Sequence, residues 1–91
     1  MAAKHAVRCL VAGHVQGVWY RAATAQRAEQ LSLSGWVKNL PDGRVEVVVA
    51  GESHSIAKLC KWLWEGSPGA IVSGITVEVW KDSVSSGFQT L

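Results

Sequence analysis

The chain has 91 residues, of which 48% are hydrophobic and 18% are charged, a composition typical of one compact domain. Nine Lys and Arg residues against seven Asp and Glu residues give a net charge of +2, and their scatter along the chain argues against a nucleic-acid partner. No apolar run approaches the roughly 20 residues that cross a bilayer, and the N-terminus lacks the long apolar segment of a signal peptide. We therefore expect residues 1–91 to form a single domain, a cytoplasmic monomer without membrane contacts.

The chain offers no recognisable metal-binding or redox motif. Cys9 and Cys60 lie far apart in the sequence and form no C-x-x-C pair, and the histidines His5, His14 and His54 share no ligand spacing. We expect the cysteines to be small buried apolar residues. We also expect no metal and no other cofactor.

A strand followed by a helix is predicted for the first third of the chain. Residues 7–12 are apolar except for Arg8 and stop at Gly13, as a strand does where it enters a loop. Residues 21–33 are mostly good helix formers, and one helical face collects Tyr20, Thr24, Ala28 and Leu31. Ser34-Gly35 is expected to end this helix, because glycine easily adopts the left-handed conformation found after a helix.

Pro41-Asp42-Gly43 predicts the turn of a β-hairpin between strands at residues 36–40 and 44–50. Proline presets φ, aspartate binds its own backbone, and glycine accepts a positive φ. The alternation in the second of these strands places three valines on the buried face, with Arg44 and Glu46 on the other. These valines are Val45, Val47 and Val49.

A second helix and two more strands complete the predicted order. Gly51-Glu52-Ser53 opens the helix, residues 66–69 end it, and its core stripe consists of Ile56, Leu59, Cys60 and Leu63. Residues 70–80 and 88–91 are the last strands, joined by a loop at 81–87. The order βαββαβ predicts an α+β, ferredoxin-like sandwich with two helices on one face of an antiparallel sheet. Because this fold hosts many functions, the function must come from particular residues.

The loop between the first strand and the first helix has the residues of an anion-binding segment. It runs from Gly13 to Arg21 and leads into a helix N-terminus, where backbone N–H groups lack acceptors and the helix dipole is positive. Gly17 allows a close approach, and Arg21 supplies a planar charged fork that can hold two phosphate oxygens. On these residues alone, an ordinary loop with a solvated arginine is an equally good interpretation.

Two phosphate chemistries are excluded by what the loop lacks. Gly13 and Gly17 are not followed by Gly-Lys-Ser/Thr, so this is no Walker A loop. A C-x5-R phosphatase cradle would need a cysteine where this chain has Val15, which carries no nucleophile. A phosphoryl group bound here would therefore pass to water, and a second residue would have to orient that water.

Two segments resemble the signatures of the acylphosphatase family, and the similarity extends from about Val7 to Leu91. Gly13-His14-Val15-Gln16-Gly17-Val18-Trp19-Tyr20-Arg21 is similar to the first signature, and Gly35-Trp36-Val37-Lys38-Asn39, continued by Gly43-Arg44-Val45-Glu46, to the second. The resemblance implies a hydrolase that cleaves acyl phosphates without a metal and has inorganic phosphate as product and inhibitor. It also implies that Arg21 binds phosphate and that Asn39 positions the attacking water. The implied phosphate loop consists of His14, Val15, Gln16, Gly17, Val18, Trp19 and Tyr20.

The chemistry of an acyl phosphate agrees with these residues. Its leaving group is a carboxylate, whose conjugate acid has a pKa of roughly 4, so no general acid is needed. Catalysis can then rest on positioning and charge stabilisation. The neutral amide of Asn39 can hydrogen-bond a water molecule but cannot take its proton.

Other interpretations remain open. On pattern alone, Asn39 is better read as a residue that caps the hairpin. An RNA-recognition module of the same fold would need stacking aromatic residues on its third strand, and residues 44–49 carry none. A non-catalytic regulatory domain that senses an anion is the alternative to an enzyme.

Overall fold

The computed structural model describes residues 4–91 and contains two helices and a five-stranded sheet. In chain order the elements are β1 (Lys4–His14), α1 (Tyr20–Gln30), β2 (Ser34–Asn39), β3 (Val45–Glu52), α2 (Ser53–Glu65), β4 (Ile71–Val79) and β5 (Phe88–Thr90). This order confirms the predicted ferredoxin-like βαββαβ arrangement, with β5 as the short additional strand. Neither α1 nor α2 is long and apolar enough to cross a bilayer. The expectation about a signal peptide concerns the N-terminus, and residues 1–3 lie outside the described part of the chain.

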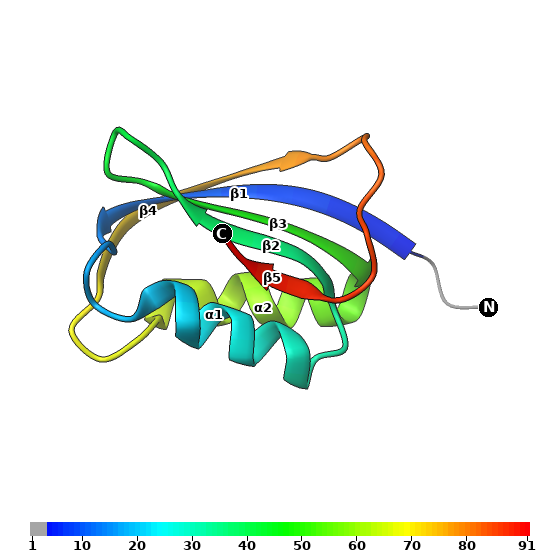
Figure 1. The fold of residues 1–91 in the computed structure, drawn as a ribbon, viewed down its shortest axis with the longest axis horizontal. Helices are drawn as coiled ribbons and strands as arrows, with labels where there is room; N and C mark the ends of the chain where they lie inside the picture. The colour runs from blue at the N-terminus through cyan, green and yellow to red at the C-terminus, as the bar shows by residue number, and fades with distance from the viewer. Residues whose placement is uncertain (1–3) are drawn as a thin grey trace.

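The strands are ordered β4-β1-β3-β2-β5, and both helices pack on the same face of the sheet (Figure 1). Strands β4, β1, β3 and β2 pair antiparallel, as predicted, whereas β5 runs parallel to β2 and makes the sheet mixed. This parallel pairing sets Thr90 opposite Val37. The end of the last strand therefore lies beside the end of β2, two residues before Asn39.

The core lies between the helices and the sheet. The predicted faces are confirmed for Tyr20, Thr24 and Ala28 on α1, for Ile56, Leu59 and Leu63 on α2, and for Val45, Val47 and Val49 on β3, all of which are buried. The Tyr20 hydroxyl donates a 2.7 Å hydrogen bond to the carbonyl of Leu63. This bond joins the two helices and satisfies one of the last carbonyls of α2, which lack intrahelical donors.

Cys9 and Cys60 meet where β1 faces α2. Cys9 is buried, as expected, whereas Cys60 is partly exposed. Their sulfur atoms lie 3.8 Å apart as a thiol–thiol hydrogen bond. The two cysteines are therefore a contacting pair of thiols and not two separate apolar residues.

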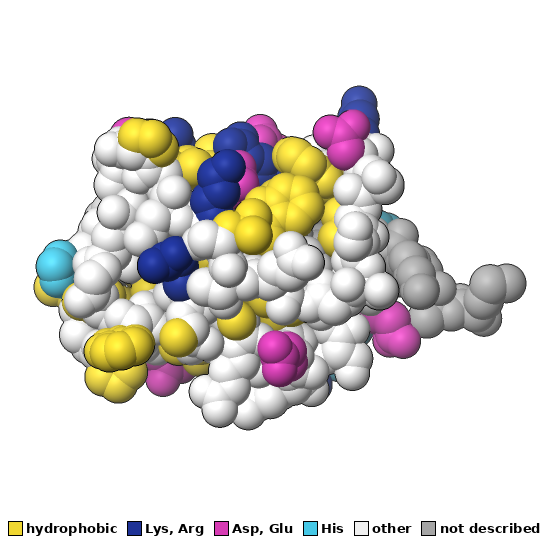
Figure 2. Space-filling view, viewed as in Figure 1, with side chains coloured by type: hydrophobic (Ala, Val, Ile, Leu, Met, Phe, Trp, Pro, Cys, Tyr) yellow, Lys and Arg dark blue, Asp and Glu magenta, His cyan; other side chains and the backbone are white. Residues whose placement is uncertain are grey.

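The sheet face opposite the helices carries its own packed cluster. Trp36 and Trp80 meet edge to face with ring centroids 5.5 Å apart, and Val48 beneath this face is fully buried. Glu46 lies on this face as predicted, but it is only 7% exposed. It accepts hydrogen bonds from Arg8 at 2.7 Å and from the Trp36 indole at 3.0 Å. Figure 2 shows acidic and basic side chains next to one another over the sheet, beside a group of apolar ones.

The predicted end of the first helix is wrong by three residues. Helix α1 stops at Gln30, and Ser32 adopts the left-handed conformation with φ 58°. Gly35 lies within β2, where a β-carbon would come 1.8 Å from the carbonyl oxygen of Val48. Glycine is thus required at this position by the close approach of two strands and not by the end of a helix.

Candidate active site

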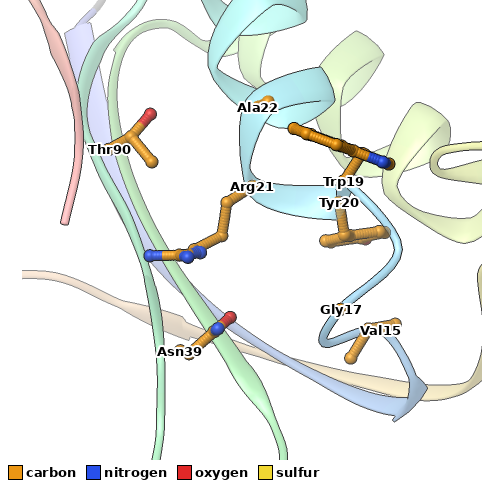
Figure 3. A pocket seen from close by; sticks show the side chains of 8 residues that line it. All are labelled: Val15, Gly17, Trp19, Tyr20, Arg21, Ala22, Asn39 and Thr90. Carbon is orange, nitrogen blue, oxygen red and sulfur yellow. The ribbon is translucent and has the colours of Figure 1, made fainter.

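A pocket of about 370 Å³ opens at the N-terminus of α1, beside the ends of β2 and β5 (Figure 3). Arg21 is the one charged residue among those that line it. The lining residues are Val15, Gly17, Trp19, Tyr20, Arg21, Ala22, Asn39 and Thr90.

The β1–α1 loop beside this pocket contains unpaired backbone amides. The N–H groups of residues 16–19 donate to no protein acceptor within the part of the chain that the structure describes. Gly17 and Trp19 have positive φ angles of 75° and 63°. Left-handed residues in such a loop create the concave arrangement of N–H groups that binds anions, and the N-terminus of α1 adds positive potential. For Trp19, which is not glycine, this conformation costs on the order of 1 kcal/mol.

Two side-chain contacts hold the loop in place. The amide nitrogen of Gln16 donates to the carbonyls of Leu40 and Arg44, at 2.9 and 3.0 Å, and so attaches the loop to the β2–β3 turn. On the other side, the buried hydroxyl of Ser67 donates a 2.6 Å hydrogen bond to the carbonyl of Val18. The loop is therefore preorganised before any ligand binds.

Arg21 extends from the first turn of α1 across the pocket (Figure 3). Its Nη1 donates a hydrogen bond to the backbone carbonyl of Leu91. A cation at a helix N-terminus is disfavoured by the helix dipole. The placement of Arg21 is explained if an anion binds next to it.

Asn39 is the last residue of β2, and its amide points into the space between Arg21 and the loop (Figure 3). Its Oδ1 is buried and accepts no hydrogen bond from residues 4–91. The hairpin is capped by Asp42 instead, which accepts hydrogen bonds from the backbone N–H and the Nε of Arg44, at 3.0 and 2.8 Å. These bonds, the backbone one foremost, lower the pKa of Asp42. The interpretation of Asn39 as the capping residue is therefore wrong.

The structure brings most of the predicted site residues together. Val15, Gly17, Trp19 and Tyr20 line the pocket with Arg21 and Asn39. The side chains of the other three predicted loop residues, His14, Gln16 and Val18, do not line the pocket. His14 is exposed at the end of β1 opposite Ile71, Gln16 binds the hairpin, and Val18 packs against the core.

Two lining residues, Ala22 and Thr90, were not predicted. Ala22 follows Arg21 directly and could have been inferred from its place in the first helical turn. Thr90 carries no signal in the sequence, because it reaches the pocket through the parallel pairing of β5 with β2. Within residues 4–91, no three His, Cys, Asp or Glu side chains are grouped as metal ligands would be.

Comparison with known proteins identifies the family of this chain. Residues 7–90 match the family model described as Acylphosphatase. The chain is 52% identical over 73 residues to the acylphosphatase of Nitrosococcus oceani, covering 80% of this chain and 82% of that one. It is 55% identical over 71 residues to that of Methylococcus capsulatus, covering 78% and 77%. An acylphosphatase structure from Coxiella burnetii superposes with a TM-score of 0.92 at 43% identity, covering 97% of this chain and 93% of that one. The chain therefore belongs to the acylphosphatase family.

Proposed function

We propose that this protein is an acylphosphatase that hydrolyses the carboxyl–phosphate anhydride of small acyl phosphates to a carboxylate and inorganic phosphate. The free amides of the β1–α1 loop and the guanidinium of Arg21 bind the phosphate group, and Asn39 orients the attacking water. The reaction uses no metal or other cofactor. Inorganic phosphate, as the product, inhibits by binding to the same groups.

The observation that carries this proposal is the buried, unpaired Oδ1 of Asn39 in the pocket that Arg21 lines. A buried polar atom without a partner is costly, so a bound water molecule or ligand is the expected partner of this oxygen. A water molecule can donate to this oxygen while its own oxygen faces the phosphorus atom. The donors that a phosphate needs are supplied separately, by the loop and Arg21.

The reaction needs no general acid because the bond between phosphorus and the acyl oxygen breaks easily. The water oxygen attacks phosphorus, and the bond from phosphorus to the acyl oxygen breaks, so that the carboxylate leaves with the electron pair. Because this leaving group is stable as an anion, it needs no proton. The proton of the water passes to a phosphate oxygen of the substrate, since an amide cannot accept it.

The proposal assigns the activity to one copy of the chain. It takes the enzyme to be a monomer formed by one domain, residues 1–91, in which Arg21 and Asn39 of the same chain line one pocket. Its substrate is a small molecule in the cytoplasm, and it requires neither nucleic acid nor a membrane.

The test is a comparison of substrates by the purified protein. We expect hydrolysis of benzoyl phosphate and acetyl phosphate, with p-nitrophenyl phosphate and ATP nearly untouched. The leaving groups of the last two, p-nitrophenoxide and ADP, are more basic than a carboxylate and need assistance that Arg21 and Asn39 do not supply. Addition of a chelator should leave the rate unchanged. Activity that a chelator abolishes and a divalent metal restores would contradict the metal-independent mechanism. Phosphate binding without any turnover would indicate the anion-sensing domain instead.

A further inference from the structure

Trp19 leaves its indole in solvent at the edge of the pocket. It is 83% exposed, the largest exposed fraction among the large hydrophobic side chains of residues 4–91. Its neighbours in the chain behave differently, since Tyr20 is buried and Val18 packs against the core. A tryptophan contributes most when its large apolar surface is covered. A molecule bound in the pocket would cover this indole, because Trp19 lines the pocket.

The backbone holds Trp19 in this position. Its left-handed conformation, with φ 63° and ψ 17°, occurs directly before the first turn of α1. Glycine would adopt this conformation without strain, whereas a residue with a β-carbon is strained there. Strained residues of this kind cluster at sites that bind ligands. The strain at Trp19 is thus a second sign, independent of its exposure, that the side chain has a use.

The in-line geometry of phosphoryl transfer indicates that the acyl group of the substrate lies nearest to Trp19. In Figure 3, Asn39 lies at the lower end of the pocket, Trp19 at the upper end, and Arg21 between them. In phosphoryl transfer, the attacking and leaving oxygens lie roughly in line on opposite sides of phosphorus. With the phosphate at Arg21 and the water at Asn39, the leaving acyl group extends toward Trp19.

We propose that Trp19 binds the acyl group of the substrate and selects aromatic and other apolar acyl phosphates over acetyl phosphate. This inference rests on the proposed function and adds the class of acyl group to it. The apolar group stacks on the face of the indole and removes both surfaces from water. Acetyl phosphate, whose methyl group is small, covers little of the indole and gains little binding free energy from this contact.

Three variants separate the contribution of the Trp19 side chain from that of its backbone conformation. Trp19→Gly removes the indole and relieves the strain, so this variant should fold at least as well as the parent. Trp19→Phe keeps an aromatic face. Trp64→Ala is the matched control, because Trp64 is 55% exposed on α2 and does not line the pocket.

The first measurement is kcat/KM for benzoyl phosphate and acetyl phosphate. Trp19→Gly should lower the value for benzoyl phosphate by about three- to tenfold, mainly through KM, as expected for the loss of one aromatic contact. Because Trp19 also belongs to the loop that supplies the phosphate-binding amides, the value for acetyl phosphate and the inhibition by inorganic phosphate report changes in that loop, and we expect both to fall less than the value for benzoyl phosphate. Trp19→Phe should restore most of the preference, and Trp64→Ala should change neither substrate. Equal losses for both substrates, or no loss for either, would overturn the role of Trp19.

A second measurement does not depend on turnover. Calorimetric titration with benzylphosphonate and methylphosphonate, which cannot be hydrolysed, should show tighter binding of the aromatic ligand by the parent and equal binding by Trp19→Gly. If the parent hydrolyses neither acyl phosphate but keeps this preference, the proposed reaction fails while the binding role of Trp19 stands. If the parent shows no preference between the phosphonates, the role of Trp19 fails whatever the activity.

Discussion

The guanidinium of Arg21 donates a hydrogen bond to the backbone carbonyl of Leu91, and the N–H of Leu91 donates in turn to the carbonyl of Val37 at 2.9 Å. Arg21 at the start of α1 is thereby attached to the backbone that follows β5, next to β2. A guanidinium has five N–H donors, so this bond fixes the side chain and leaves other donors for a phosphate. The arginine is therefore held in position before the substrate arrives.

Replacing Arg21 should remove phosphate binding and turnover together. We expect Arg21→Gln to lower kcat/KM for benzoyl phosphate by about 10³-fold, because one charged donor to the reacting group is lost. The inhibition constant of inorganic phosphate should rise at least about tenfold. Lys61→Gln, which removes an exposed cation of α2, is the control for net charge. Unchanged inhibition by phosphate in Arg21→Gln would show that phosphate binds elsewhere.

Truncation of Asn39 should separate binding from chemistry. Asn39→Ala should lower kcat by roughly 10²-fold and keep inhibition by phosphate within a few-fold, because the amide acts on the water and not on the phosphate. Its free energy of unfolding should change little, since Oδ1 makes no hydrogen bond within residues 4–91. Asp42→Ala is the matched control in the same hairpin, and it should lose some stability with normal kcat. A normal kcat in Asn39→Ala would remove Asn39 from the mechanism.

Gln16 should affect phosphate binding and turnover because its side chain holds the β1–α1 loop in position. Gln16→Ala loses both hydrogen bonds to the hairpin and should lower the free energy of unfolding by about 1 kcal/mol. Both kcat/KM and phosphate affinity should fall by about five- to tenfold, because the amides are no longer held in place. Gln16→Glu should be worse, since a carboxylate would face two carbonyl oxygens. Gln26→Ala, at an exposed position of α1, should have no effect. A loss of stability without a loss of phosphate affinity would contradict this role.

Stability in acid should depend on Glu46. Burial raises the pKa of this carboxyl, but hydrogen bonds from Trp36 and Arg8 outweigh it, and the net pKa is lowered. Because the folded state holds the proton less tightly than the unfolded state, Glu46 contributes stability above its unfolded pKa of about 4.3. That contribution is lost as the pH falls through the lower pKa that Glu46 has in the folded state. Glu46→Gln should lower the free energy of unfolding by about 1–3 kcal/mol at pH 7 and flatten its fall below pH 4.5 or so. Glu29→Gln, exposed on α1, should leave the acid profile of denaturant unfolding as it is in the parent.

The two cysteines should differ in reactivity. A hydrogen bond from the Cys9 thiol lowers the pKa of Cys60 to about 7 against the opposing effect of burial, and the pKa of Cys9 is raised. We expect iodoacetamide to alkylate Cys60 first, at a rate that rises as the pH increases through about 7. Peptide mass spectrometry identifies the modified residue. Cys9→Ala removes the donor and should move this rise to higher pH. Earlier modification of Cys9 would contradict the assignment.

What the sequence predicts well is local. The strand–loop–helix around Gly17 and the hairpin around Asp42 depend on residues that are neighbours in the chain, and both form as expected. The helix face that begins at Tyr20 is likewise a short-range pattern. Such features are encoded by periodicity and turn chemistry, which require no knowledge of distant contacts.

What could not be predicted depends on contacts between distant segments. The helix α1 ends early because Ser32 takes the left-handed conformation, although glycine at position 35 is the better candidate by propensity. Gly35 is needed instead for the approach of β3, which only the register of two strands reveals. Thr90 joins the pocket for the same kind of reason, through the pairing of β5 with β2.

The tryptophans on the two sides of the molecule provide separate optical signals. Trp36 and Trp80 meet edge to face at 5.5 Å on the open side of the sheet, away from the pocket that Trp19 lines. A fixed, chiral pair of indoles gives near-ultraviolet circular dichroism only while its packing persists. This band should therefore report the folded sheet in the pocket variants, in which Trp36, Trp80 and Glu46 are unchanged. Fluorescence that changes when a ligand is added, in contrast, should disappear with Trp19→Gly and persist in a variant that lacks Trp80.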